Sequence, residues 1–213
     1  MTSVFAVCVI FYLIGSIPTA YILVKIKYKK NLIKEGSGNI GARNTYDVTN
    51  SRLDGIIVLI ADFLKGFLPA IWFACYSGIG VEKIILPAVF LILGHNYSVW
   101  IKFKGGRGLA TGAGIMAVLN FSPIIIWLIF CAVFYFIYKN IHVANVISLI
   151  LMPISFFLFY DFLSGFNSGL LSESIDSRDT VIYTNLAVCL VILMKHISPL
   201  KEYFIERGIK KKN

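Results

Sequence analysis

The sequence predicts an all-α integral membrane protein, a bundle of seven transmembrane helices with the N-terminus outside and the C-terminus in the cytoplasm. Composition is the first of three observations behind this prediction. Of the 213 residues, 58% are hydrophobic and 15% are charged, whereas soluble domains average about 45–50% and about 25%. The lengths of the apolar segments and the placement of the basic residues are the other two.

Seven apolar segments follow one another along the chain. A helix needs about 17–25 apolar residues to cross about 30 Å of hydrocarbon, and backbone in lipid must be hydrogen-bonded within helices or a closed barrel. Runs such as residues 124–138 lack the alternation of barrel strands, so helices are predicted. The expected spans are 3–25, 55–77, 84–101, 109–120, 122–138, 143–163 and 180–195.

The basic residues favour seven spans. The segments inside would be 25–54, 102–107, 139–142 and 195–213, and they hold 17 of the 20 Lys and Arg residues. Lys83 and Arg178 would lie outside and Lys65 within a span, which agrees with the excess of basic residues in cytoplasmic loops. A re-entrant segment 109–120 would leave six spans and move the 139–142 turn outside, against this bias.

The first span, 3–25, is expected to be a retained anchor. No basic residue precedes it, and it runs directly into KIKYKK, unlike a cleavable signal peptide. The expected outer loop 164–179 carries the acidic residues Glu173, Asp176 and Asp179. Because no repeat or linker is visible, one domain over residues 1–213 is expected.

The net charge of +9 follows the membrane topology, so a nucleic-acid partner is not expected. The four cysteines lie in apolar segments without a CxxC pair and are expected to be small core residues rather than disulfides or metal ligands. These are Cys8, Cys75, Cys131 and Cys189. No metal or cofactor is expected.

Two charged residues interrupt the second span. Asp62 and Lys65 are three residues apart, so they share a helix face and can pair. The pair could be a structural lock between helices, or Lys65 could face a polar active-site cavity. Gly66 and Pro69, which follow directly, loosen the helix there and favour the second interpretation.

Two glycine-rich basic loops lie on the expected inner side. In the first, residues 34–52, glycines alternate with Ser37 and asparagines, and Arg43 can bind two phosphate oxygens at once. A basic loop resting on anionic lipid would explain the lysines but not the glycines. The second loop, FKGGRGLATG at residues 103–112, resembles an anion-binding nest in front of a helix that begins near Gly108.

The sequence excludes several common devices for group transfer. The second loop does not match GxxxxGK[ST], so nucleotide hydrolysis is not indicated. No histidine is followed by Asp five residues later, and no GxSxG elbow occurs. His196 is either a helix end group or a catalyst, His95 could bond the second loop, and His142 is expected to have no role.

Four blocks of the chain together resemble the PlsY family, the acyl-phosphate-dependent glycerol-3-phosphate acyltransferases of bacterial plasma membranes. The blocks are GSGNIGARN, DFLKGFLPA, GHNYSVWIKFKGGRGLATGAG and a terminal KH. The resemblance covers nearly the whole chain. It implies transfer of an acyl group from acyl phosphate to the 1-hydroxyl of sn-glycerol 3-phosphate, without metal or coenzyme A, at the cytoplasmic side of the inner membrane.

The resemblance also implies roles for individual residues. The catalytic set is Ser37, Lys104 and His196. The phosphate-binding set is Gly38, Asn39, Arg43, Asn44, Gly105, Gly106, Arg107, Gly108 and Thr111. The supporting set is Asp62, Lys65, His95 and, by a weak match, Ser148.

The chain departs from the family pattern at several positions. Ile40 and Arg43 stand where the family usually has Pro and Thr, and Asp47 stands in place of a basic residue. The family's HRxN is HISP here, with Ile197 and Pro199 replacing an arginine and an asparagine. A relative that acylates another acceptor is therefore one alternative, and a small-anion transporter or channel is the other.

Overall fold

The computed structural model describes residues 4–164 and 178–210, and the elements in these ranges are helical. They are α1 (Val4–Ser16), α2 (Thr19–Tyr28), α3 (Ala42–Thr49), α4 (Arg52–Tyr76), η1 (Val81–Lys83), α5 (Ile85–Asn96), η2 (Val99–Ile101), α6 (Leu109–Leu119), α7 (Ser122–Tyr138), α8 (Ile141–Leu158), α9 (Tyr160–Ser164), α10 (Arg178–Met194) and α11 (Ile197–Lys210).

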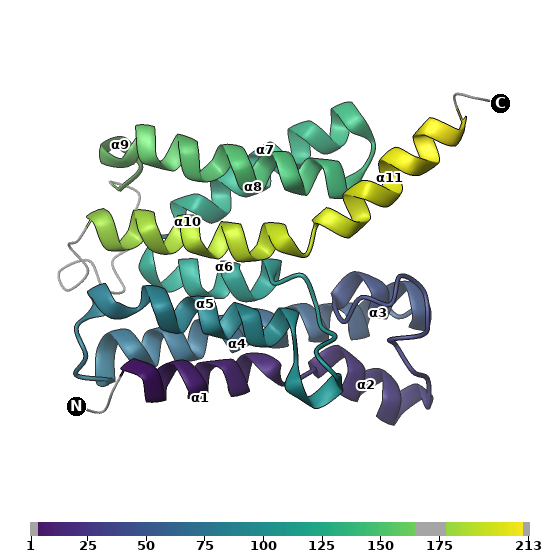
Figure 1. The fold of residues 1–213 in the computed structure, drawn as a ribbon, viewed down its shortest axis with the longest axis horizontal. Coiled ribbons are helices and arrows are strands. Elements are labelled where there is room, and N and C mark those ends of the chain that lie inside the picture. The colour runs from purple at the N-terminus through teal and green to yellow at the C-terminus, as the bar shows by residue number, and fades with distance from the viewer. Residues whose placement is uncertain (1–3, 165–177, 211–213) are drawn as a thin grey trace.

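The long helices lie along one axis (Figure 1). Helices α2, α3 and α11 and the segment 97–108 lie at one end of this bundle, which we call the loop end. Helix α9 and the turn that contains η1 lie at the opposite end (Figure 1). The helices therefore run back and forth, and both glycine-rich loops lie at the loop end.

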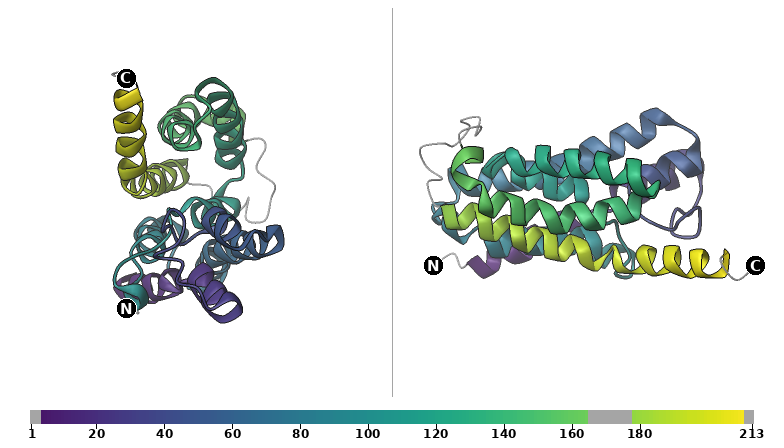
Figure 2. Two further views of the ribbon diagram at one scale, coloured as in Figure 1. Left: turned by 90° about the vertical axis from the view of Figure 1, so that its right-hand side faces the viewer. Right: turned by 90° about the horizontal axis from the view of Figure 1, so that it is seen from above.

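Helix α10 joins two groups of helices. Helix α1 packs on α5, α4 on α6, and α7 on α8, while α10 contacts α5, α6 and α8. The view along the bundle axis shows α7 and α8 on the far side of α10 from α1 (Figure 2). The main core between these helices includes the fully buried side chains of Phe11, Phe73, Leu91, Ile115 and Phe156.

Glycines bring two helix pairs into backbone contact. A Cβ added at Gly15 of α1 would lie 2.0 Å from the carbonyl oxygen of Leu91 in α5, and one at Gly66 of α4 would lie 2.0 Å from that of Thr111 in α6. Gly94 and Gly114 make the reciprocal approaches. Small residues are how membrane helices approach closely, which explains the glycines of segment 109–120.

Within residues 4–164 and 178–210, three helical segments are long and apolar enough to cross a membrane. They are Val4–Tyr28, Arg52–Tyr76 and Ile141–Leu158, and the pair α10 with α11, bent by 46°, makes a fourth if it counts as one span. Helices α6 and α7 are apolar but shorter. The structure thus supports a helical membrane protein, and the count of seven spans remains a prediction.

Several predicted elements differ from the structure. The first span is broken at Ile17 and Pro18 into α1 and α2, because proline donates no backbone hydrogen bond. The third span was expected to reach residue 101, but α5 ends at Asn96 and a turn follows, with a bridge between Ser98 and Lys104. The inner loop contains an unexpected helix, α3.

Cys75 is exposed on α4, so the expectation that all four cysteines lie in the core is wrong at that position. Glu173 and Asp176 of the expected outer loop lie outside the described residues.

Candidate active site

The two glycine-rich loops lie in contact at the loop end. The backbone N–H of Ile40 in the first loop donates to the carbonyl oxygen of Gly105 in the second, over 3.3 Å. The N–H of Gly106 donates to the carbonyl oxygen of His95 at 3.0 Å. The sequence predicted two anion-binding loops on one membrane face, and the structure brings them together.

The glycines of the second loop allow close packing. A Cβ at Gly105 would lie 2.2 Å from the carbonyl oxygen of His95, and one at Gly106 would lie 2.0 Å from His95 Nε2. Gly108 has a positive φ of 81° and caps the N-terminus of α6, a conformation that favours glycine. Any side chain at these positions would push the loop away from α5.

A cavity of about 260 Å³ lies beside the loops. Most of its lining is apolar, but charged and polar side chains also line it, and we call it the polar cavity. Its wall contains the first residues of three helices, namely Ala42 of α3, Leu109 of α6 and Ile141 of α8. The N-terminus of a helix carries a partial positive charge. The other lining residues are Asn39, Gly41, Arg43, Leu59, Asp62, His95, Arg107, Gly108, Ala110, Trp127, Cys131, His142 and Asn145.

Two arginines add full charges to this wall. Arg107 is half-buried, and its Nη1 lies 3.2 Å from His142 Nδ1. Burial, followed by the charge of Arg43, lowers the pKa of Arg107, while Glu202 raises it. Arg43 lies 3.9 Å from Asp47 in an exposed pair. Two cations and three helix ends therefore favour an anion in this cavity.

A second, apolar cavity of about 40 Å³ adjoins the first. It lies between α6, α7, α8 and α10, and Leu109 and Trp127 line both cavities. Its other walls include Met116, Leu149 and Val188. At this volume it holds only a few methylene groups, so a ligand with its charged head in the first cavity could place no more than the start of an apolar chain here.

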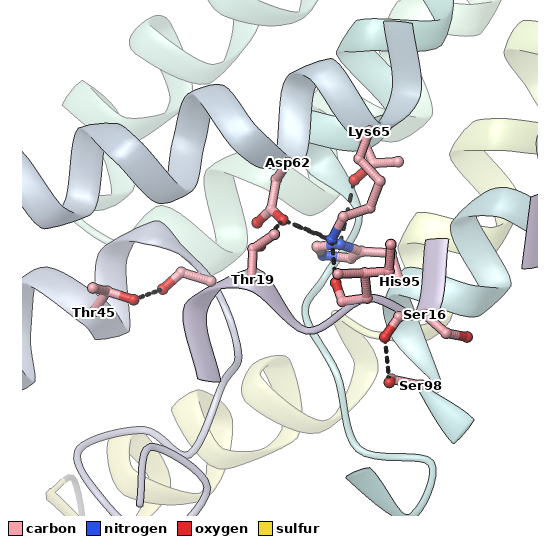
Figure 3. Close-up of polar contacts among 10 residues, drawn as sticks. Ser16, Thr19, Thr45, Asp62, Lys65, His95 and Ser98 are labelled. Carbon is pink, nitrogen blue, oxygen red and sulfur yellow. Dashed lines mark hydrogen bonds and ion pairs between the residues drawn. The ribbon is translucent and has the colours of Figure 1, made fainter. Parts of the chain in front are cut away.

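A buried polar network lies beneath the loops (Figure 3). Lys65 Nζ donates to Asp62 Oδ1 at 2.9 Å and to the carbonyl oxygen of Ile17 at 2.7 Å. Asp62 Oδ1 also accepts from Thr19 Oγ1 at 2.6 Å. Ile17 lies at the break between α1 and α2, where its carbonyl oxygen accepts from the N–H of Thr19 at 3.1 Å as well as from Lys65.

His95 connects this network to the second loop. Its Nδ1 lies 3.8 Å from Asp62 Oδ1 and 3.3 Å from Thr111 Oγ1, and its carbonyl accepts from Gly106. The sequence left open whether the Asp62–Lys65 pair is a structural lock or whether Lys65 faces the cavity of the site. Asp62 lines the polar cavity but Lys65 does not, and Lys65 ties α4 to the break between α1 and α2. The structure thus shows the lock, and a role of Lys65 at the site stays a prediction.

Asn44 organises the first loop. Its Nδ2 donates to the carbonyl oxygens of Glu35 and Asn39 at 3.1 and 3.0 Å, and its Oδ1 accepts from the N–H of Ser37 at 2.9 Å. With its amide committed to backbone groups, buried Asn44 has little capacity left for a phosphate. Thr45 Oγ1 donates to the carbonyl oxygen of Gly41 at 3.1 Å (Figure 3), which holds the start of α3.

The expected catalytic residues do not line the polar cavity. Ser37 and Lys104 are exposed. His196 is fully buried in the turn between α10 and α11, where its Nδ1 lies 3.0 Å from the carbonyl oxygen of Ile192. Ser148 is buried and donates to the carbonyl oxygen of Ala144 in its own helix, and its expected supporting role stays a prediction.

Of the expected phosphate-binding set, Asn39, Arg43, Arg107 and Gly108 line the cavity, while Thr111 is buried against His95. Sequence reasoning missed Thr19, Trp127 and His142. For His142 the missed signal was Asn140 two residues earlier, because asparagine is a preferred helix N-cap and therefore places His142 at a helix start.

Comparison with known proteins agrees with this geometry. Residues 5–205 match the family model described as glycerol-3-phosphate acyltransferase. The glycerol-3-phosphate acyltransferase of Endomicrobium trichonymphae is 33% identical over 94% of this chain and 91% of the relative. That of a Wolbachia strain from Brugia malayi is 32% identical over 90% of each.

The fold resembles solved structures as well. The crystal structure of PlsY, an integral membrane glycerol 3-phosphate acyltransferase, in its glycerol 3-phosphate form has a TM-score of 0.77 at 24% identity, covering 96% of this chain and 93% of that one. Its lysophosphatidic acid form has a TM-score of 0.75. On the family match and these relatives, the chain belongs to the glycerol-3-phosphate acyltransferase family.

Proposed function

We propose that this chain transfers a fatty acyl group from an acyl phosphate to the 1-hydroxyl of sn-glycerol 3-phosphate, giving lysophosphatidate and inorganic phosphate. The observation that carries the proposal is the polar cavity, where three helix N-termini, Arg43 and Arg107 meet next to an apolar cavity. Both substrates bring a phosphate, and the donor also brings an apolar chain. The polar cavity suits the phosphates, and the small apolar cavity next to it admits the start of the acyl chain.

In this reaction the main task of the protein is to position the two substrates. The 1-hydroxyl oxygen attacks the acyl carbonyl carbon, an ester bond forms, and the bond from that carbon to the phosphate oxygen breaks. The hydroxyl proton passes to an oxygen of the departing phosphate, so no protein base is needed. Arg43, Arg107 and the helix ends hold two anions close together and stabilise the charge that develops.

Residue roles follow from position. Asn39, Arg43, Arg107 and Gly108 bind phosphate, and Gly105 and Gly106 keep the loop against α5. The other expected site residues act less directly. Gly38 and Asn44 hold the first loop, Ser37 and Lys104 guide substrates at the exposed surface, and buried His196 holds the turn between α10 and α11 through its contact with the carbonyl oxygen of Ile192.

We further propose that one domain spans the bacterial inner membrane seven times, with the N-terminus outside and the site facing the cytoplasm. The supporting observations are the 17 of 20 basic residues in the segments that this topology puts inside, and the run of the helices back and forth (Figure 1).

The direct test is an acylation assay. Purified protein in detergent is incubated with palmitoyl phosphate and radiolabelled glycerol 3-phosphate, and we expect labelled lysophosphatidate on thin-layer chromatography. Palmitoyl coenzyme A in place of the donor, and glycerol in place of the acceptor, should give no product. Anion flux through reconstituted liposomes without any acylation would instead support a transporter and end this proposal.

A further inference from the structure

His142 is a polar side chain of the cavity wall for which the sequence suggested no role. It lies in the first turn of α8, after the helix cap Asn140. Asn140 Oδ1 accepts from the N–H groups of His142 and Val143 at 2.9 and 3.1 Å. Because Asn140 caps the helix with its own side chain, the imidazole of His142 is not needed for capping.

The contact between His142 and Arg107 determines which nitrogen of the imidazole carries a proton. A guanidinium group has five N–H donors and no acceptor. At 3.2 Å from Arg107 Nη1, His142 Nδ1 must therefore be the acceptor. An imidazole that accepts at Nδ1 is neutral there and carries its proton on Nε2. His142 thus has one N–H donor left.

That remaining donor belongs to a residue on the wall of the polar cavity. Arg107, Arg43 and the start of α3 line the same space. A phosphate there can accept hydrogen bonds on its peripheral oxygens, and such charge-assisted bonds are stronger than neutral ones. The contact with His142 also restrains the long Arg107 side chain, which lowers the entropy cost of binding.

We propose that His142 is a substrate-binding residue: its Nδ1 holds the Arg107 guanidinium in place, and its Nε2–H donates to an oxygen of a substrate phosphate in the polar cavity. The inference rests on the proposed acylation. The phosphate comes from glycerol 3-phosphate or from the acyl phosphate, and the two have the same recognition chemistry.

The test compares three variants with the wild type in the acylation assay. His142→Phe keeps a ring without nitrogens, and His142→Asn keeps an acceptor oxygen near the Nδ1 position. Lys139→Asn is the control, because it removes a positive charge in the preceding turn, Lys139 does not line the cavity, and asparagine tolerates its φ of 51°.

We expect His142→Phe to raise the KM for one phosphate substrate by about tenfold or more, while kcat changes by less than about threefold. His142→Asn should recover part of this loss, and Lys139→Asn should match the wild type. A rise for glycerol 3-phosphate alone assigns the acceptor's phosphate to His142, and a rise for palmitoyl phosphate alone assigns the donor's. Unchanged KM values for both, or equal losses in the Phe and Asn variants, overturn the inference.

A second measurement does not depend on turnover. Thermal unfolding is followed while inorganic phosphate is titrated, and the concentration that gives half-maximal stabilisation should rise about tenfold in His142→Phe. His142→Ala serves if the Phe variant is not recovered from membranes. An unchanged half-maximal concentration refutes the role of His142, whereas a wild type that makes no lysophosphatidate refutes the acylation itself.

Discussion

Arg107 and Lys104 lie three residues apart in the same loop, but the structure separates them. Arg107 is half-buried, contacts His142 and lines the polar cavity, whereas Lys104 is exposed and does not. A charge enclosed by protein is screened less than one in water, so its interaction with a bound anion is stronger. We therefore expect Arg107 to contribute more to anion binding than Lys104, although the two residues carry the same charge.

We expect Arg107→Ala to lower kcat/KM by about 100-fold or more, since removing one such donor costs about 2.7–4 kcal/mol of transition-state stabilisation. Lys104→Ala should cause a clearly smaller loss. Steady-state kinetics on the two purified variants make the comparison. A larger loss from Lys104→Ala would mean that the exposed lysine, not the cavity wall, binds the substrate.

The contact between the two loops leaves no room for a side chain at Gly106. A methyl group there would lie 2.0 Å from His95 Nε2 and 2.8 Å from the carbonyl oxygen of Ile40, so both loops would have to separate. We expect Gly106→Ala to lower kcat by at least about tenfold while the protein still inserts. Gly78→Asn is the control, because a Cβ at Gly78 meets nothing within 4 Å. Normal turnover in Gly106→Ala would contradict the contact between the loops.

The Asp62–Lys65 pair gives a prediction about stability. Both side chains are about 95% buried, so Lys65→Met leaves the Asp62 charge without its cation and should cost about 3–5 kcal/mol. The double variant Asp62→Asn with Lys65→Met removes both charges and should be more stable than Lys65→Met alone. Thermal unfolding in detergent measures the difference. If the double variant is the least stable of the three proteins, the unpaired charge of Asp62 does not explain the stability lost in Lys65→Met.

At the scale of elements, pairs of helices in close contact carry the loops. Helix α6 begins where the segment 97–108 ends, and it packs on α4 through Gly66 and Gly114. Helix α5 ends where that segment begins, and it packs on α1 through Gly15 and Gly94. Two backbone-to-backbone contacts therefore support the loop from both sides.

A methyl group at Gly66 should disturb the site at a distance. It would lie 2.0 Å from the carbonyl oxygen of Thr111, so α6 must move away from α4 and take the second loop with it. We expect Gly66→Ala to lower both the melting temperature and kcat. Ala132→Val on the exposed face of α7 adds atoms without a neighbour and should leave both unchanged. Loss of stability with full activity would argue against this coupling.

At the scale of the whole molecule, the candidate site lies at the loop end, and the opposite end contains turns. The first loop, the segment 97–108 and the start of α8 meet at the loop end (Figure 1). The same end carries most of the basic residues. The charge bias that orients a membrane protein thus also brings cations to the site.

Cysteine labelling tests the proposed orientation. In a variant without the four native cysteines, Gly78→Cys should react with a membrane-impermeant maleimide in right-side-out vesicles, and Lys139→Cys only in inverted vesicles. Gly78 lies between α4 and η1, and Lys139 lies between α7 and α8. These two turns lie at opposite ends of the bundle (Figure 1). Labelling of both from the same side would rule out the seven-span topology.

The sequence by itself determined the helical class, the membrane environment and the two glycine-rich loops, because these depend on composition, apolar length and local backbone freedom. It also identified Asp62 and Lys65 as candidate site residues, because a charge within an apolar segment has a high free-energy cost. The resemblance to the family rested on the same short motifs. All of these properties are local in the chain.

Only the tertiary structure decided which residues face the site. Arg107 and His142 are 35 residues apart, and Lys65 meets the carbonyl of Ile17 across 48 residues. Such contacts depend on how helices pack, as do the exposure of Lys104 and Ser37 and the burial of His196. Periodicity shows which face of a helix is apolar, but it does not show which neighbour that face meets, and here the neighbour makes the site.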